Sequence, residues 1–182
     1  NGWTLLSDSS WPGYSDLSHR LMEGYTVFMA EAERQISAPT HIFLQAGVGG
    51  LAGAAAAMAR KLWGDAPVIV VVEPQHAPAL HGCIQAGDFV AAKGPGSAMG
   101  RLDCLEASLI ALKGLAKDAD VFALISEEEG QAGADYAAAH QMESTASGAA
   151  GLAALLASPA HRAALKLDAN SHVLVILSEG PE

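Results

Sequence analysis

The sequence predicts an α/β fold with an open, mostly parallel, twisted sheet and helices on both faces. The run at residues 68–72 is continuously apolar and β-branched, which is typical of a parallel strand covered on both faces, and residues 172–177 predict a second apolar strand. Between such runs, apolar residues recur at helical spacing. Strands that alternate with helices form this kind of sheet through crossover connections.

The first third of the chain is expected to supply a strand, a helix and a second strand. Residues 3–6 predict a short strand, and a long amphipathic helix to about residue 36 follows a turn-rich stretch. A strand at 41–44 then enters a glycine turn. An alanine-rich helix follows to about residue 63, where Gly64 supplies a stop.

The rest of the chain continues the alternation within one domain, without an internal repeat. The strand at 68–72 belongs at the centre of the sheet, and a helix is expected near 77–86. Residues 87–101, rich in Gly, Ala and Pro, predict a long surface loop of the kind that borders binding sites. Helical patterns return at 103–116, 127–140, 147–157 and 159–165.

Composition favours a small-molecule function. The net charge of −10 gives no basic surface for nucleic acid or an anionic membrane. No apolar run approaches the roughly 20 residues of a membrane span, so we expect a cytoplasmic protein. The spacing of the seven histidines predicts no metal site, and Cys83 and Cys104 are expected to be buried thiols.

The glycine-rich turn after the strand at 41–44 is the strongest candidate site. Glycines let the backbone approach a ligand closely, and the N-terminus of the following helix favours an anion. The N–H groups that we expect to hold a phosphate are those of Gly47, Val48, Gly49, Gly50 and Leu51.

Two other interpretations of this turn stay open. Residues 47–52 satisfy the GxGxxG/A fingerprint, and Glu73 ends the next strand where a ribose-binding acid belongs, so an NAD-binding oxidoreductase domain is one alternative. The other alternative is a structural one, in which the small residues only let the helix pack close to the sheet.

Two elements around the turn are specific: an Asp-x-x-Trp-x-Gly-Tyr element at 8–14 and a Gln-Ala-Gly-Val-Gly loop at 45–49. Shorter segments accompany them at 2–4, 21–25, 39–41, 72–74, 173–176 and 179–180. Together, and in this order, they resemble diaminopropionate ammonia-lyase, a pyridoxal-phosphate enzyme of fold type II in the tryptophan-synthase-β-like superfamily.

The resemblance implies a reaction and a role for several residues. The reaction is α,β-elimination from 2,3-diaminopropionate, which yields pyruvate and ammonia. The glycine loop would hold the phosphate of pyridoxal 5′-phosphate, and Ser178 would contact the pyridine nitrogen. Asp8 matches a family aspartate that removes the α-proton of one substrate enantiomer, a role that burial beside Trp11 would assist by raising its pKa. Alternatives remain for both residues. Ser178 can be an ordinary polar residue at the end of a strand, and Asp8 can belong to a turn or cap a helix.

The chain departs from the family pattern in several places. Glu106 matches a family Cys-x-Glu element near the pocket, although an exposed helix carboxylate is the alternative. Relatives carry a glutamate where this chain has Ala146, and Glu143, three residues earlier, does not replace it. The family's partner for Cys104 is Ala79 here, which argues against a disulfide.

No lysine of the chain matches the N-terminal lysine that attaches the cofactor in this superfamily. The lysines are Lys61, Lys93, Lys113, Lys117 and Lys166. We therefore expect residues 1–182 to be the C-terminal, cofactor-binding portion of the large domain, with the lysine-bearing segment and the small domain outside this chain. By itself it would be inactive. The family implies a homodimer, and a non-catalytic binding or dimerisation module is a further alternative.

Overall fold

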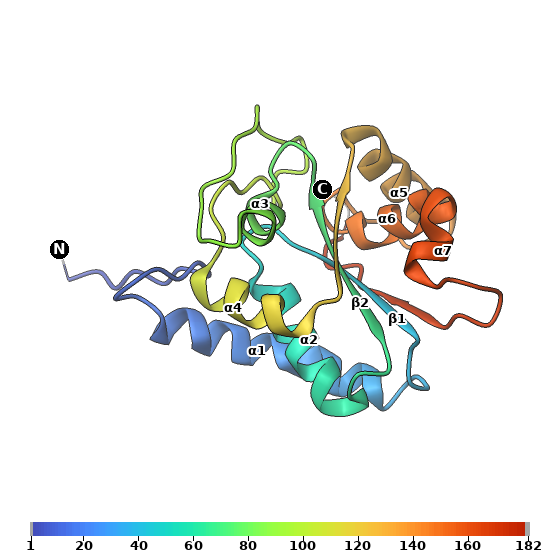
Figure 1. The fold of residues 1–182 in the computed structure, drawn as a ribbon, viewed down its shortest axis with the longest axis horizontal. Helices are drawn as coiled ribbons and strands as arrows, with labels where there is room; N and C mark the ends of the chain where they lie inside the picture. The colour runs from blue at the N-terminus through green and yellow to red at the C-terminus, as the bar shows by residue number, and fades with distance from the viewer. Residues whose placement is uncertain (1, 181–182) are drawn as a thin grey trace.

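The computed structural model describes residues 2–180, which form a four-stranded sheet between two layers of helices (Figure 1). The strand order is β3-β2-β1-β4, and all neighbouring strands are parallel. This architecture confirms the predicted α/β class. The strands are β1 (His41–Gln45), β2 (Val68–Pro74), β3 (Val121–Ile125) and β4 (Val173–Val175).

Helices cover both faces of the sheet. In Figure 1, α1, α2 and α4 lie on one side of the strands and α5, α6 and α7 on the other. The helices are α1 (Asp16–Glu33), α2 (Gly50–Trp63), α3 (Ala79–Ala86), α4 (Leu109–Asp118), α5 (Glu127–Ala139), α6 (Ala150–Ala157) and α7 (Arg162–Leu165), with a 3₁₀ turn at Ser158–His161.

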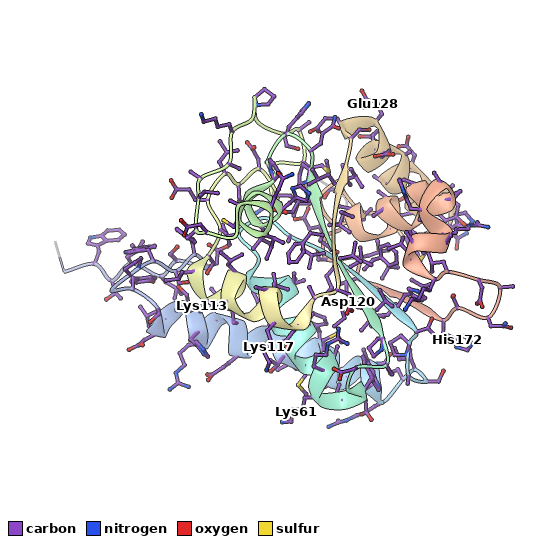
Figure 2. All side chains as sticks on the ribbon, viewed as in Figure 1. Lys61, Lys113, Lys117, Asp120, Glu128 and His172 are labelled. Carbon is purple, nitrogen blue, oxygen red and sulfur yellow. The ribbon has the colours of Figure 1, made fainter. Side chains whose placement is uncertain are left out.

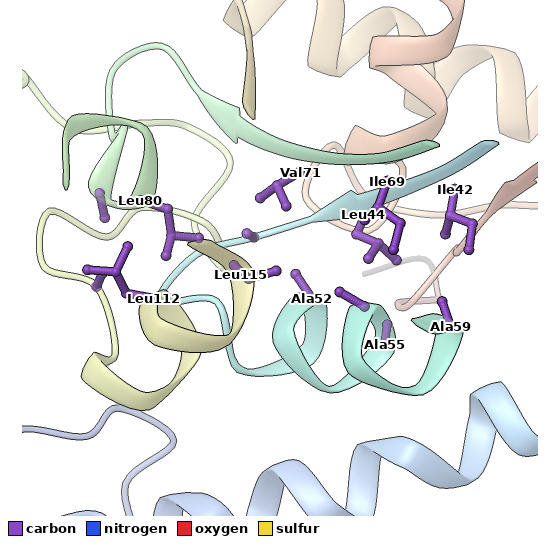
Figure 3. Packing of buried hydrophobic residues seen from close by; sticks show 14 of the residues in the cluster. Ile42, Leu44, Ala52, Ala55, Ala59, Ile69, Val71, Leu80, Leu112 and Leu115 are labelled. Carbon is purple, nitrogen blue, oxygen red and sulfur yellow. The ribbon is translucent and has the colours of Figure 1, made fainter. Parts of the chain in front are cut away.

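The alternation of side chains along β1 and β2 divides the core into two clusters. On the first face, Ile42, Leu44, Ile69 and Val71 are fully buried. They face the alanines of α2 and the leucines of α4 (Figure 3). Alanine lets α2 lie close to the sheet, which places the first turn of α2 directly after β1. The α2 residues of this cluster are Ala52, Ala55, Ala56 and Ala59.

The second cluster lies on the opposite face. Phe43, Val70 and Val72 pack there against α6 and the loop before α4. A Cβ atom at Gly151 would lie 3.0 Å from the carbonyl oxygen of Phe43, so α6 touches the backbone of β1. This close approach brings the segment before α6 to the carboxyl end of β1.

Most predicted elements are confirmed, with shifted ends. The long first helix, the glycine turn, the alanine-rich helix and the long loop are present, and β2 is an interior strand. Predicted residues 103–108 do not join α4, because the N–H group of Ser108 bonds to the carbonyl of Val48 at 2.9 Å and its hydroxyl contacts that of Ser10. The last strand ends at Val175, because the carbonyl of Ile176 accepts a hydrogen bond from the side-chain amide of Gln45 and not from a neighbouring strand.

One sequence expectation about strands is wrong, and one strand has no counterpart in the sequence analysis. Residues 3–6 form no strand, and within the described residues no strand lies beside them to pair with. Conversely, the sequence patterns do not predict β3. Its five apolar residues are too few for periodicity to separate a strand from a helix. The better signal is the capping box that follows, in which Ser126 and Glu129 satisfy each other's backbone N–H groups.

Among residues 2–180, no helix has both the length and the apolar character that crossing a bilayer requires.

Candidate functional site

The turn between β1 and α2 leaves the N-terminus of α2 open. Gly49, the N-cap residue, has φ +98°, a left-handed conformation that favours glycine. It supplies no capping side chain, and the first turn of α2 carries no acidic residue. The first helical bond runs from the N–H of Gly53 to the carbonyl of Gly49 at 2.8 Å.

Consecutive backbone donors are therefore available at this turn. Within the described part of the chain, the N–H groups of Gly47, Gly49, Gly50 and Leu51 donate to no protein acceptor, whereas the N–H of Val48 points toward the sulfur of Cys104. Unpaired N–H groups at the positive end of a helix dipole form an anion site. A phosphate monoester fits these donors in charge and in hydrogen-bonding capacity.

A cavity of about 270 Å³ opens over this turn. Five separate parts of the chain contribute to its wall: the N-terminal segment, α1, the glycine turn, the loop before α4 and the segment after β4. All residues that the sequence analysis assigned to the site line this cavity. They are Asp8, Gly47, Val48, Gly49, Gly50, Leu51 and Ser178.

Glycine at position 47 is required by packing rather than by its backbone angles. A Cβ atom there would lie 2.9 Å from the carbonyl oxygen of Arg101 and 3.1 Å from the Sγ atom of Cys104. At Gly50, by contrast, a Cβ atom would have no neighbour closer than 3.8 Å. The loop before α4 is thus closely packed on one side of the turn, while the cavity lies over the other.

Asp8 is held at the cavity by buried serines. The hydroxyl of Ser18 donates to the carbonyls of Ser7 and Ser9, at 3.0 and 2.8 Å, on either side of Asp8. The Ser10 hydroxyl lies 2.9 Å from that of Ser108, beside the start of α4. These contacts fix the backbone that carries the carboxylate.

The surroundings of Asp8 differ from the expectation. Asp8 is exposed, and Trp11 stacks on Tyr14 with a ring separation of 4.4 Å. The expected burial of Asp8 beside Trp11 is therefore absent.

Ser178 meets the end of β1 through Gln45. The Nε2 atom of Gln45 lies 2.9 Å from the hydroxyl oxygen of Ser178 and also contacts the carbonyls of Gly148 and Ile176. Gln45 belongs to the sequence motif, but the sequence analysis does not assign it to the site. A polar residue at the carboxyl end of an otherwise apolar parallel strand is the signal that could have identified it.

Besides Gln45, four cavity residues with polar or ionisable side chains are not assigned to the site from sequence: Tyr25, Arg101, Cys104 and Glu179. The Glu179 carboxylate accepts from the hydroxyl of Thr145, and its other oxygen lies 3.8 Å from Nε of Arg101. Partial burial raises the pKa of the Cys104 thiol, and the charges of Asp8 and Asp103 raise it further, so this thiol stays protonated.

The carboxylate of Glu73 is engaged elsewhere. It is fully buried and accepts the N–H groups of Leu80 and His81, both at 2.7 Å, at the start of α3. It does not line the cavity over the glycine turn. The acid that the NAD interpretation assigned to a ribose therefore serves as a helix cap.

Two family-derived glutamates lie away from the cavity. Glu106 and Glu143 are exposed and do not line it. Cys83 and Cys104 are free thiols; Cys83 is buried and Cys104 partly so. None of the described lysines lines the cavity either. Figure 2 shows Lys61 on α2 and Lys113 and Lys117 on α4.

Comparison with known proteins decides the family. The sequence profile of the pyridoxal-phosphate dependent enzymes matches residues 1–179. The chain belongs to this family. Its cofactor is pyridoxal phosphate, and the anion site over the glycine turn agrees with a phosphate-bearing ligand.

Individual members of this pyridoxal-phosphate enzyme family confirm the resemblance seen in the sequence. Diaminopropionate ammonia-lyase of Escherichia coli K12 is 30% identical over 99% of the chain and 50% of the relative. The crystal structure of the Escherichia coli enzyme with an aminoacrylate-pyridoxal-phosphate reaction intermediate matches with a TM-score of 0.89 at 28% identity, covering 98% of this chain and 50% of that one.

More distant enzymes share the fold. A fungal L-serine ammonia-lyase from Rhizomucor miehei matches with a TM-score of 0.79 at 20% identity, over 94% of this chain and 53% of that one. The chain spans about half the length of the diaminopropionate ammonia-lyase that it matches over nearly all of its own residues.

Proposed function

We propose that this chain forms the cofactor- and substrate-binding part of an ammonia-lyase that acts on 2,3-diaminopropionate. The observation that carries the proposal is the single cavity that gathers the free N–H groups of the glycine turn, the hydroxyl of Ser178 and the carboxylate of Asp8. Similarity to diaminopropionate ammonia-lyase over nearly the whole chain supports the substrate class.

Each group in the cavity has a separate task in this proposal. The N–H groups of residues 47–51 bind the phosphate, and Ser178 donates to the pyridine nitrogen. When bound, pyridoxal phosphate withdraws electrons from the substrate's α-carbon.

Asp8 takes the α-proton of one enantiomer as the Cα–H and Cβ–N bonds break. The first ammonia leaves, and hydrolysis of the released enamine gives pyruvate and the second ammonia. A carboxylate is one of the side chains that serve as general bases, and Asp8 lines the cavity that would hold the substrate.

The amine that attaches the cofactor comes, in our proposal, from outside these 182 residues. The absence of a described lysine from the cavity wall supports this. We therefore assign residues 1–182 to the large, cofactor-binding domain, and we expect the chain by itself to release no pyruvate. The complete enzyme would be a cytoplasmic homodimer.

The phosphate site is tested with pyridoxine 5′-phosphate, which needs no lysine. Isothermal calorimetry should show saturable binding that inorganic phosphate competes away. Gly50→Asp places a carboxylate at the open N-terminus of α2 and should reduce the affinity at least tenfold. Gly24→Asp on α1, where a new side chain meets nothing within 4 Å, is the matched control and should bind normally. Equal binding by both variants would contradict the proposal.

The substrate class is tested with conjugates in which pyridoxal phosphate is joined to an amino acid by a reduced, stable C–N bond. The conjugate of 2,3-diaminopropionate should bind more tightly than that of alanine. One enantiomer should lose this advantage in Asp8→Asn, because the carboxylate no longer attracts the substrate's second ammonium group. If both conjugates bind equally well, 2,3-diaminopropionate is not the substrate.

A further inference from the structure

The side-chain amide of Gln45 forms an unusual set of contacts beside the cavity. Gln45 is only 4% exposed. Its Nε2 atom lies 3.0 Å from the carbonyl oxygen of Gly148, 2.9 Å from that of Ile176 and 2.9 Å from Oγ of Ser178. These contacts connect the end of β1 to the segments before α6 and after β4.

The two carbonyls determine which way the amide points. A carbonyl oxygen only accepts hydrogen bonds, so the atom between two carbonyls is the NH₂ group and not the amide oxygen. An amide NH₂ group has no lone pair to offer. The Ser178 hydroxyl therefore cannot donate to Gln45, and its oxygen shares the two hydrogens of the NH₂ group with the two carbonyls as a third acceptor.

The hydrogen of the Ser178 hydroxyl is consequently directed away from Gln45. Within residues 2–180, the Ser178 hydroxyl donates to no protein acceptor, and Ser178 lines the cavity. A hydroxyl whose oxygen is oriented by one donor has its hydrogen available for a ligand atom that carries a lone pair.

The other end of the amide supports this interpretation. The Oε1 atom of Gln45 is buried without a hydrogen-bond partner in the described structure. A buried polar atom left unpaired is costly, and such exceptions in folded proteins call for an explanation. The NH₂ group at the other end of the amide supplies hydrogen-bond donors that an apolar side chain of the same size would lack.

We propose that Gln45 is a positioning residue that makes Ser178 a hydrogen-bond donor toward the pyridine nitrogen of the cofactor. The inference rests on the proposed function, because it requires the ring to lie in this cavity. It also explains the direction of the hydrogen bond. With Gln45 in place, the Ser178 hydroxyl can donate to an unprotonated ring nitrogen, whereas accepting a hydrogen bond from a protonated nitrogen is disfavoured.

The test compares two ligands that differ at one ring atom. Pyridoxine 5′-phosphate has the nitrogen, and its 1-deaza analogue has a C–H group in its place. Gln45→Met should weaken binding of the nitrogen ligand about three- to tenfold, the range of one neutral hydrogen bond. Binding of the deaza analogue should not change. Gln131→Met is the matched control, since Gln131 is exposed and lies on α5.

A double-mutant cycle separates orientation from general stability. Ser178→Ala should produce the same selective loss, and adding Gln45→Met to it should produce no further loss for the nitrogen ligand. If Gln45→Met does not fold, Gln45→Leu takes its place, since leucine also lacks the NH₂ group and adds no charge beside the two carbonyls. The same selective loss should appear.

The outcomes distinguish the two proposals. Equal weakening of both ligands by Gln45→Met, or additive losses in the double variant, would overturn the role of Gln45 while leaving the phosphate site intact. Failure of the unmodified protein to bind either ligand would overturn the proposed function and the role of Gln45 together.

Discussion

Gly49 combines a left-handed backbone with close packing. A Cβ atom at this position would lie 3.0 Å from Cδ1 of Leu80 and 3.2 Å from Cβ of Ala111. Gly49→Ala should lower the free energy of unfolding by about 2–4 kcal/mol, the sum of backbone strain and overpacking. Denaturant titration measures the loss.

The control for this prediction is a glycine with free space. Gly114 lies within α4, and a Cβ atom there meets nothing within 4 Å. Gly114→Ala should stabilise the protein by about 0.5–1 kcal/mol through helix propensity. Loss of stability by Gly114→Ala, or none by Gly49→Ala, would show that the packing around α2 differs from this description.

The raised pKa of Glu73 makes the free energy of unfolding depend on pH. Burial raises its pKa from 4.5 to about 7, against the lowering effect of its bonds to Leu80 and His81. The folded protein therefore retains a proton that the unfolded chain has lost. The contribution of Glu73 to stability is complete below pH 4.5 and is lost as the pH rises through about 7.

The variant Glu73→Gln isolates this contribution. Between about pH 4.5 and 8, the parent protein should lose about 3 kcal/mol more stability than the variant, since one pKa unit corresponds to about 1.4 kcal/mol. Chemical denaturation at several pH values measures the difference. Parallel pH profiles for the two proteins would contradict a protonated, buried Glu73.

At the scale of elements, α1 holds the N-terminal segment through one hydroxyl. Ser18→Ala removes the bonds to the carbonyls of Ser7 and Ser9 and should cost about 1–2 kcal/mol. Hydrogen exchange at residues 7–10 should accelerate, because the segment loses its attachment to α1. Thr26→Ala on the same helix is the control, since its hydroxyl bonds only to Glu23 of its own helix. Unchanged exchange in Ser18→Ala would refute this anchoring.

The elements also show where sequence patterns are informative. The helix at Asp16–Glu33 is predictable because three turns or more of apolar periodicity allow few alternatives. The strand expected at residues 3–6 is absent because an apolar run becomes a strand only beside another strand. The start of α4 at Leu109 is not predictable because it depends on Ser108, whose partners Ser10 and Val48 are distant in sequence.

At the scale of the whole molecule, Arg60 joins α2 to the ends of two strands. Its guanidinium donates to the carbonyls of Gly64, Pro67 and Asp118 and to the carboxylate of Asp120, which also accepts the N–H of Ile69 at 2.7 Å. Arg60→Met should cost about 2–4 kcal/mol, because several partly buried acceptors lose their donor at once.

The measurement for Arg60 is a comparison with Arg60→Lys. Lysine keeps the charge but not the planar fork, so its loss should lie between that of the parent and that of Arg60→Met. A single unfolding transition in both variants, shifted from that of the parent protein, would show that the region around Arg60 unfolds together with the rest of the protein. If methionine costs no more than lysine, the hydrogen bonds are not the source of stability.

The sequence by itself determined the α/β class, the glycine turn and the resemblance to a pyridoxal-phosphate enzyme. These depend on patterns local to the chain: periodicity, turn chemistry and short motifs at fixed spacing. It also placed Asp8 and Ser178 with the glycine turn, although only the family resemblance connected residues so far apart.

Only the tertiary structure decided what each of these side chains faces. It left Asp8 exposed, engaged Glu73 as the cap of α3, and brought Arg101 and Glu179 to the cavity wall. It also set the amide of Gln45 against Ser178. Burial and hydrogen-bond partners depend on contacts between segments far apart in the chain, such as the pair Gln45 and Ser178, and no local pattern specifies these contacts.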